Sequence, residues 1–487
     1  PGFTQIFVLP SDGGTPRQIT EGAFDHGGAL SWSVDSSMIL FSSNREQGWE
    51  LQTSESDIFA ISIADGSLKQ ITSEPGSERS PVYSPDGKKI AFTKQANTPV
   101  MFRTTFLAVM NADGSSEQIL TDQLDRSVAN IKWAGDSEHL YFQYDDRAVR
   151  KVAIVDLKGK IKTLAAGLSG TSLGRPYSSG SYNVNNNGLL AFTYGTADRP
   201  ANIAIMNNGD RQVLTQLNED FLGHKDLGKI HEIIYASSHD GQEIQGWYMT
   251  PPGFDADKKY PLVLEIHGGP SSAYGPNFSA EYQRFAAEGY VIFFDNHRGS
   301  AGYGERFSML LHNKYSSVDD FADHNSGVDA MIELGFIDEE NLFITGGSAG
   351  GIAAAYAIGL TDRFNAAGVI KPIVNWLSKS LVADSSIGQL HNQFPGFPWD
   401  HVEHFWQRSP MSLVGNVTTP TLLMTGEEDR RTPISEIEQY YQALKLLEVD
   451  TIMVRVPGSP HGIAGRPSRL NAKVDNIMAW FERYKSH

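Results

Sequence analysis

The chain of 487 residues contains no cysteine. Disulfide bonds, thiolate metal sites and a cysteine nucleophile are therefore excluded. Long apolar runs are also lacking: none reaches about 18 residues, so the sequence predicts no membrane-spanning helix. No signal peptide is visible, and the sequence starts at Pro1 without methionine. We expect a cytoplasmic location, and we expect the native N-terminus to lie upstream of Pro1.

Basic residues are outnumbered by acidic ones. The chain has 40 Lys and Arg against 57 Asp and Glu, a formal net charge of −17. This balance argues against nucleic acid and anionic membrane surfaces as partners. An apolar content of 40% is ordinary for a globular protein, and the length exceeds that of one hydrophobic core. The sequence predicts two or three domains, and it leaves open whether copies assemble into a homo-oligomer.

The first half of the chain repeats itself about every 50 residues. Similar segments that close with phenylalanine recur at 32–41, 83–92, 133–142 and 183–192. The closing phenylalanines are 51, 50 and 50 residues apart. A second motif, an apolar run followed by Asp-Gly and Gln-Ile, recurs in phase at 6–20, 58–72 and 107–121. A period near 50 with several short strands in each unit is typical of β-propeller blades.

Each unit contains alternating apolar runs broken by Asp-Gly or Asp-Ser turns, which is the chemistry of β-hairpins. We interpret Asp35, Asp86 and Asp136 as turn formers rather than catalytic acids. Four clear units are followed by a partial one over 202–215. Because the chain starts inside a unit, we expect the propeller to be incomplete at its N-terminus. The first domain is therefore predicted to be an all-β propeller over residues 1–230.

The second half alternates short apolar strands with amphipathic helices. After a hairpin around 238–241, strands are predicted at 261–266, 290–294, 342–344, 421–425 and 452–456, and helices near 317–332, 352–358, 434–447 and 470–484. Such alternation implies a mostly parallel, doubly wound sheet covered on both faces. The second domain is predicted to be an α/β domain over residues 231–487.

A sharp turn between one of these strands and its helix carries the sequence Gly346-Gly347-Ser348-Ala349-Gly350. It matches G-x-S-x-G, the nucleophile elbow of α/β-hydrolases, in the strand–turn–helix context that the motif requires. Only glycine lets the backbone pass closely beneath the serine, and the helix N-terminus favours developing negative charge. Ser348 is the predicted nucleophile.

A serine nucleophile needs a base, and the base needs an orienting acid. In α/β-hydrolases these residues follow the serine in the order acid, then histidine, each after a strand. Asp429 follows the strand 421–425, and His461 follows the strand 452–456. Glu427 and Glu428 are rival acids on the same loop, which we interpret as solvated surface carboxylates. The predicted triad is Ser348, Asp429 and His461.

The tetrahedral intermediate needs N–H donors for its oxyanion. One is predicted at Ala349, the residue after the serine, and the other at Gly269 in the glycine-rich segment 267–270. We interpret His267 as structural, and we expect Arg298 and the turn 302–304 to pack beneath the site. His391, His401 and His404 lack metal-ligand spacing, and we interpret them as a local loop feature around the pocket. We expect no metal and no cofactor.

These segments together resemble the prolyl oligopeptidase family of serine peptidases. The motifs His267-Gly-Gly-Pro270, Gly346–Gly351, Gly426–Asp429 and Pro457–Gly462 are most similar to its acylaminoacyl-peptidase-like branch. The resemblance implies a propeller that caps the α/β-hydrolase and acts as a size filter for short peptide substrates. It also places Trp376 and Lys371 near the specificity pocket. A glutamate pair that holds a free amino terminus in the family's dipeptidyl peptidases is not identifiable.

Three functions remain open at this point. The first is a serine peptidase that releases acylated residues or short units from the N-termini of short peptides. The second is another hydrolase that uses the same acyl transfer: a dipeptidyl-peptidase or oligopeptidase of the same family, or an esterase with the same triad. The third is a binding module in which the propeller holds a partner and the hydrolase is vestigial. The complete set of triad and oxyanion residues favours an enzyme.

Overall fold

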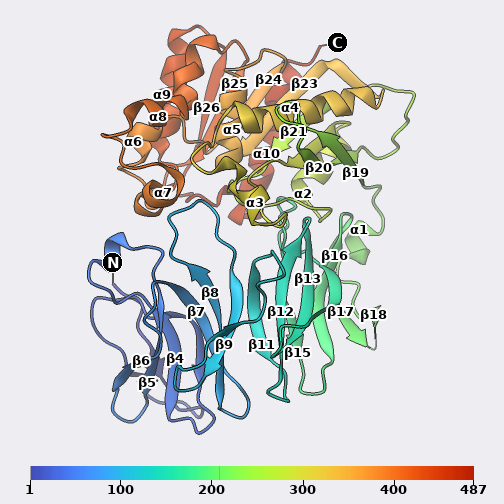
Figure 1. Cartoon of the computed structure of the whole chain (residues 1–487). Helices are drawn as coiled ribbons and strands as arrows, with labels where there is room; N and C mark the ends of the chain where they lie inside the picture. Colours follow the sequence, from blue (N-terminus) through green and yellow to red (C-terminus); the bar gives the residue numbers. More distant parts are fainter. Residues whose placement is uncertain (1, 208, 487) are drawn as a thin grey trace.

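The computed structural model describes residues 2–207 and 209–486. The chain forms two parts that lie face to face: a part made almost entirely of strands and a part in which helices surround one sheet (Figure 1). The strand-rich part ends with β18 (Asp210–Val213), and the sheet of the second part begins with β19 (Lys229–Ala236). The short helix α1 (Glu219–Leu222) lies between them.

The first part contains four antiparallel units of four strands, preceded by a two-stranded piece, β1 (Phe7–Val8) and β2 (Arg17–Gln18). A single pairing between Leu168 and Tyr194 joins the third and fourth units into one eight-stranded sheet. The units consist of β3 (Gly27–Trp32), β4 (Met38–Ser43), β5 (Asp57–Ser62) and β6 (Leu68–Gln70); β7 (Gly76–Tyr83), β8 (Lys89–Ala96), β9 (Phe106–Asn111) and β10 (Gln118–Ile119); β11 (Val128–Trp133), β12 (His139–Asp146), β13 (Val149–Asp156) and β14 (Ile161–Leu168); and β15 (Tyr182–Val184), β16 (Leu190–Thr196), β17 (Arg199–Asn207) and β18. These are the predicted propeller blades.

The sequence prediction of a separate partial unit over 202–215 is wrong. Strand β17 pairs with β16, and β18 pairs with β17, so this stretch completes the fourth blade. The two sequence motifs correspond to the inner and the outer strand pair of one blade. The motif at 6–20 forms an outer pair, β1 and β2, and the described residues contain no inner pair for it.

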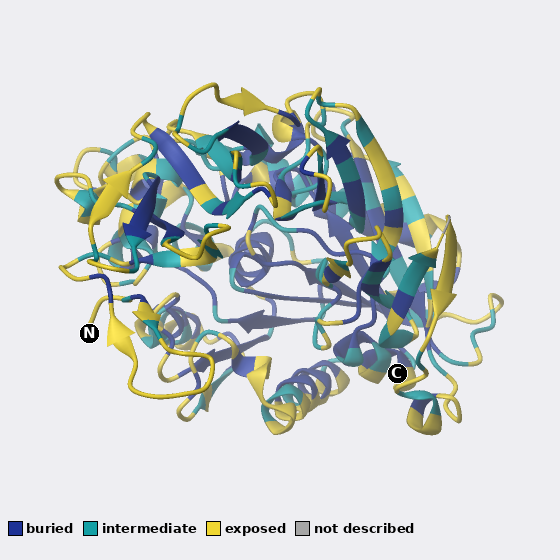
Figure 2. Cartoon of the chain, turned by 90° about the horizontal axis from the view of Figure 1, so that it is seen from below, coloured by how far each residue is buried: buried dark blue, intermediate teal, exposed yellow. Residues whose placement is uncertain are grey.

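The recurring phenylalanine explains how the blades pack. Phe41, Phe92 and Phe142 are fully buried, and Phe192 is 2% exposed. Phe92 packs with Leu40 and other apolar residues of the preceding blade, so each period inserts one aromatic side chain between neighbouring blades. In Figure 2, which is seen from the propeller side, the blades form an arc in front of the α/β part. Within residues 2–207 and 209–486, no strand ladder joins the first blade to the fourth.

The second part is built on an eight-stranded sheet in the order β19-β20-β22-β21-β23-β24-β25-β26. Its other strands are β20 (Glu243–Thr250), β21 (Tyr260–Ile266), β22 (Val291–Asn296), β23 (Ile337–Gly347), β24 (Ala366–Ile370), β25 (Thr421–Gly426) and β26 (Thr451–Val456). The strands from β22 to β26 are parallel, and the hairpin β19–β20 is joined antiparallel at one edge. This is the mostly parallel sheet of an α/β-hydrolase.

Helices cover both faces of this sheet. Along β21, Leu262 and Leu264 face one core and Val263 faces the other, as the two-residue period of a strand requires. One core receives α2 (Ala280–Ala287) and α10 (Pro467–Arg483), and the other receives α4 (Val318–Glu333), α5 (Ala349–Ala357) and α9 (Ile434–Leu446). The short helices α3 (Glu305–Ser308), α6 (Trp376–Lys379), α7 (Ser386–Gln393) and α8 (Val402–Gln407) lie in connections.

Local sequence chemistry explains where helix α4 begins and why strand β24 was not predicted. Ser317 caps α4 through a capping box with Asp320, as the predicted helix start implied. Strand β24, Ala-Ala-Gly-Val-Ile, was not predicted, because alanine and glycine have low strand propensity. It is a strand because both of its neighbours, β23 and β25, offer it a parallel ladder in a fully buried position.

The turn 302–304 does not pack beneath the nucleophile as the sequence suggested. It contacts the propeller: the Gly302 carbonyl accepts from the Arg147 amide, and Gly304 lies against the Asp125 carboxylate. The Glu305 amide and side chain continue this contact to Asp125 and Thr104. The turn therefore joins the two parts of the chain. Among the described residues, no helix is long and apolar enough to cross a membrane.

Arg298 supplies a first test of this packing. It is 2% exposed and binds the fully buried Asp323 at 2.8 Å and Asp240 at 2.9 Å. Arg298→Met leaves Asp323 as a buried carboxylate without its cation, so we expect the free energy of unfolding to fall by about 3–5 kcal/mol. The measurement is urea denaturation followed by tryptophan fluorescence.

The control for this variant is Arg284→Met. Arg284 is half exposed and pairs with Glu288 at 2.6 Å on the surface of α2. Its loss is expected to change stability by less than about 1 kcal/mol. Equal losses in the two variants would contradict the importance of the buried pair.

Candidate active site

Ser348 stands at the turn between β23 and α5 with φ +60° and ψ −123°. A non-glycine residue in this region is strained, by about 1–3 kcal/mol, and such strain is typical of functional turns. The neighbouring glycines permit it: a Cβ on Gly350 would lie 2.0 Å from the Ile266 carbonyl oxygen, and one on Gly346 would lie 2.3 Å from that of Gly350. The glycines of the motif are therefore sterically required.

Two loops bring an imidazole and a carboxylate to this serine. The His461 Nε2 atom lies 3.0 Å from the Ser348 Oγ atom, and its Nδ1 atom lies 2.7 Å from Asp429 Oδ2. Asp429 follows β25 and His461 follows β26, so the neighbouring carboxyl ends of parallel strands place them together. The structure joins all three residues of the predicted triad in one hydrogen-bonded chain.

Asp429 is held as a carboxylate. It is buried, which opposes ionisation, but the hydrogen bonds from His461 and Thr432 outweigh burial and hold its pKa below the usual value. Its Oδ1 atom accepts from the Arg431 and Thr432 amides at 2.9 Å, and the Thr432 hydroxyl donates to Oδ2. The rival acids Glu427 and Glu428 are exposed.

The two predicted oxyanion donors lie next to the serine. Ala349 is the first residue of α5, so its N–H has no partner within the helix. Gly268 and Gly269 line the same pocket as Ser348, and a Cβ on Gly268 would lie 3.4 Å from the Ser348 Cβ. The structure thus brings the glycine loop against the nucleophile.

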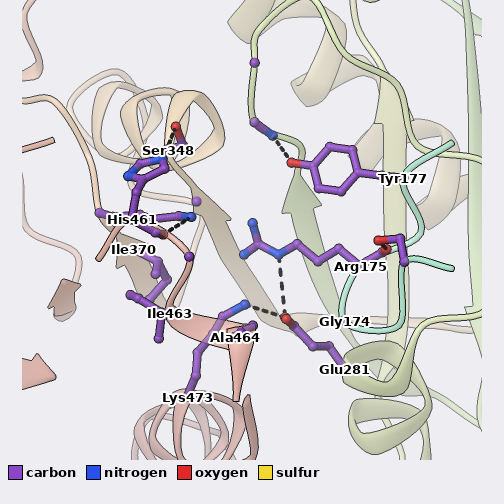
Figure 3. A pocket seen from close by; sticks show the side chains of 17 residues that line it. Gly174, Arg175, Tyr177, Glu281, Ser348, Ile370, His461, Ile463, Ala464 and Lys473 are labelled. Atoms are coloured by element: carbon purple, nitrogen blue, oxygen red, sulfur yellow. Dashed lines mark hydrogen bonds and ion pairs between the residues drawn. The ribbon is translucent and has the colours of Figure 1, made fainter. Parts of the chain in front are cut away.

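The propeller contributes four of the described residues that line the pocket, Ser172, Gly174, Arg175 and Tyr177, and the sequence analysis missed them. Tyr177 and Arg175 lie between β14 and β15 and point at the pocket from the side opposite His461 (Figure 3). The Tyr177 hydroxyl accepts the Gly268 N–H at 2.9 Å, and the Tyr177 ring packs on Tyr274 with centroids 4.6 Å apart. A hydroxyl from the first part of the chain therefore holds the oxyanion loop of the second part.

Arg175 extends this contact into a buried group of charges. Its Nη2 atom lies 3.0 Å from Glu265, and its Nε atom lies 3.5 Å from Glu281. Glu281 also pairs with Lys473 of α10, and both of these side chains are buried. Burial lowers the pKa of Arg175, but Glu265 and Glu281 more than compensate and raise it, so the guanidinium remains charged.

Of the two residues predicted near the specificity pocket, Lys371 lines the pocket at Ser348 and Trp376 does not. The Lys371 Nζ donates to the His461 carbonyl at 2.7 Å. Burial, with the positive charges of Arg175 and Lys473, lowers the pKa of Lys371 to about 7. Trp376 is 2% exposed and packs edge-on against Phe394 in the core, so its predicted place in the pocket is wrong.

The remaining histidines fall into two groups. The described residues that line the pocket at Ser348 do not include His391, His401 or His404. Asp295, His297 and His324 are buried and near enough to hold a metal ion. However, Asp295 accepts from Tyr235 and His324, and this carboxylate helps raise the pKa of His324 against its burial, so the two form an ion pair.

This geometry can perform acyl transfer. An imidazole, oriented by a carboxylate, can act as general base for the serine hydroxyl, and backbone N–H groups lie at the same pocket. At the carboxyl edge of a parallel sheet, these features define a serine hydrolase of the α/β class.

The comparisons with known proteins agree with this class. Residues 276–487 match the prolyl oligopeptidase family, and residues 1–178 match the TolB β-propeller domain. The match identifies the catalytic part of the chain, residues 276–487, as a serine peptidase domain of the prolyl oligopeptidase family.

Several relatives extend the likeness over most of the chain. An uncharacterized peptidase of Bacillus subtilis, YuxL, is 29% identical over 99% of this chain and 86% of its own length. Dipeptidyl-peptidase 5 of Porphyromonas gingivalis is 25% identical over 93% of this chain, which spans 66% of that relative. The acylamino-acid-releasing enzyme of Arabidopsis thaliana is 33% identical over 52% of this chain, but only 32% of its own length.

The solved structures show the same fold. An acylaminoacyl peptidase of Pyrococcus horikoshii superposes with a TM-score of 0.84 at 22% identity, over 99% of this chain and 76% of the other. The arrangement of propeller and hydrolase is therefore shared.

Tyr177→Phe tests the contact across the two parts. The variant keeps the ring packing on Tyr274 but leaves the Gly268 N–H without its acceptor, so the oxyanion loop loses a positioning contact. We expect kcat on a peptide substrate to fall about tenfold with little change in KM, because the oxyanion forms only in the transition state.

The control is Tyr144→Phe, which removes a hydroxyl contact to Thr163 inside the propeller, away from the pocket. It should leave kcat and KM unchanged. A rise in KM alone for Tyr177→Phe, with kcat intact, would contradict the positioning role.

Proposed function

We propose that this chain hydrolyses short peptides through an acyl-enzyme formed on Ser348, and that it releases an acylated residue from the peptide N-terminus. The hydrogen-bonded chain from Ser348 through His461 to Asp429 carries the proposal. The peptide substrates, the cytoplasmic location and the exclusion of folded proteins by the propeller belong to the same proposal.

The steps follow from the contacts. His461 Nε2 takes the proton of Ser348 as Oγ attacks the scissile carbonyl, and Asp429 stabilises the imidazolium that forms. The N–H groups of Ala349 and Gly269 donate hydrogen bonds to the negative charge that develops on the carbonyl oxygen. His461 then gives its proton to the leaving nitrogen, and water, activated by the same imidazole, releases the acyl group from Ser348.

The likeness of the catalytic half to a plant acylamino-acid-releasing enzyme supports the release of an acylated residue. The likeness to dipeptidyl-peptidase 5 makes dipeptide release the second candidate.

Ser348→Ala tests the reaction. Removal of the nucleophile of a triad lowers kcat by about 10⁴-fold or more, so we expect no measurable peptide cleavage and no labelling by a fluorophosphonate. Ser380→Ala is the matched control, because Ser380 is a buried serine that donates to the Trp376 carbonyl outside the pocket. Cleavage by Ser348→Ala at the rate of the control would contradict the proposal.

A digest of matched short peptides tests the substrate. Each peptide is supplied with an acetylated and with a free amino terminus, and the products are identified by mass spectrometry. We expect release of single acetylated residues, with kcat/KM at least about tenfold higher for the blocked series. Release of dipeptides from the free series would assign the chain to the second candidate.

A further inference from the structure

The pocket at Ser348 has a volume of about 360 Å³ and continues past the catalytic residues into the buried charges. Figure 3 shows Ser348 and His461 on one side, Tyr177 and Arg175 on the other, and Glu281 and Lys473 at its inner end. The turn after His461, residues 462–465, forms part of the wall. His461 protonates the leaving nitrogen, so a wall made by the turn that follows it places this space on the leaving-group side.

When Lys371 is protonated, the pocket holds more positive than negative charge. Arg175, Lys371 and Lys473 are the cations, and Glu281 is the carboxylate that lines the pocket with them. Glu265 adds a second carboxylate behind Arg175, where it also accepts from Tyr282 and Tyr274. Lys473 and Arg175 are thus each paired with a glutamate, whereas within residues 2–207 and 209–486 the acceptor for Lys371 is the His461 carbonyl.

The Nη1 atom of Arg175 lies beside the nucleophile and is available to bind a ligand. Its Nη2 and Nε atoms face Glu265 and Glu281, and no protein acceptor binds Nη1 among the described residues. A Cβ on Gly347 would lie 2.6 Å from this Nη1 atom, so the guanidinium lies against the residue before Ser348. Because Gly347 has no side chain, the Arg175 guanidinium fits in this position.

We propose that this pocket binds a carboxylate of the substrate on the leaving-group side of Ser348, through Arg175 Nη1 and Lys371 Nζ. This inference rests on the proposed peptidase function and adds the chemical class of the leaving group. Burial and the nearby cations lower the pKa of Lys371 to about 7, and a ligand carboxylate would supply the counter-charge that favours the protonated amine, through charge-assisted hydrogen bonds.

The position of Arg175 favours a carboxylate close to the scissile bond. In a peptide that ends one residue after this bond, only the α-carbon separates the α-carboxylate from the scissile nitrogen. An acidic side chain on the leaving residue could supply the same group. The preferred substrates are therefore acylated dipeptides with a free C-terminus, or peptides with Asp or Glu after the scissile bond.

The experiment measures binding without hydrolysis. Ser348→Ala protein is titrated by calorimetry with acetyl-Ala-Ala carrying a free carboxylate and with its C-terminal amide. A second pair, acetyl-Ala-Asp amide and acetyl-Ala-Asn amide, presents the carboxylate on the side chain. We expect at least about tenfold tighter binding of one acid over its matched amide, and the pair that shows it identifies the source of the carboxylate.

Variants then assign the effect to the pocket. In the Ser348→Ala background, Lys371→Met should reduce the preference for acid over amide by about tenfold. Arg175→Met should do the same, but Arg175 also pairs with Glu265 and Glu281, so Lys371→Met is the decisive variant. Lys379→Met is the matched control: Lys379 is a buried lysine that donates to Ser385 outside this pocket, and its loss should leave the preference unchanged.

The outcomes separate this inference from the proposed function. Equal binding of acid and amide in both pairs would overturn the carboxylate site, and so would a preference that survives Lys371→Met. Equal hydrolysis of the acid and amide peptides by the wild-type protein would leave the peptidase proposal standing while it removes the inference. Selective binding of the acid without any peptide hydrolysis would retain the site and overturn the proposed function.

Discussion

The strained backbone at Ser348 is the constraint on which the site depends. With φ at +60°, the serine turns away from β23 and directs its hydroxyl above the carboxyl edge of the sheet. The turn closes only because Gly346 and Gly350 carry no side chain. A Cβ atom at either position would lie about 2 Å from a backbone carbonyl oxygen. The sheet core, packed on both faces, holds β21, β23 and α5 in place and supplies the stability that this strain consumes.

The triad is a consequence of sheet topology. Strands β23, β24, β25 and β26 are parallel neighbours, so the loops that follow them open on the same edge. Asp429 and His461 therefore meet Ser348 although 81 and 113 positions separate them from it in the chain. Thr432 and the amide of Arg431 fix the carboxylate that orients the imidazole.

The propeller is part of the active site as well as a cover. Its segment before β15 is bound to the hydrolase by hydrogen bonds from Ala280 to Leu173 and from Gly275 to Pro176. This anchoring lets Tyr177 hold the oxyanion loop and lets Arg175 enter the charged pocket. Movement of the propeller relative to the hydrolase would therefore alter the oxyanion loop and the leaving-group pocket together.

The sequence by itself determined the propeller period, the nucleophile turn and the order of the triad. These features are encoded locally: Phe recurs every 50 or 51 residues, and glycines flank Ser348 within one turn. Only the tertiary structure decided that Trp376 belongs to the core and that Arg175 and Tyr177 belong to the site. The roles of Arg175 and Tyr177 depend on contacts between segments about 90 or more residues apart in the chain, such as Tyr177 with Gly268. A local pattern contains no information on which distant surface a side chain will meet.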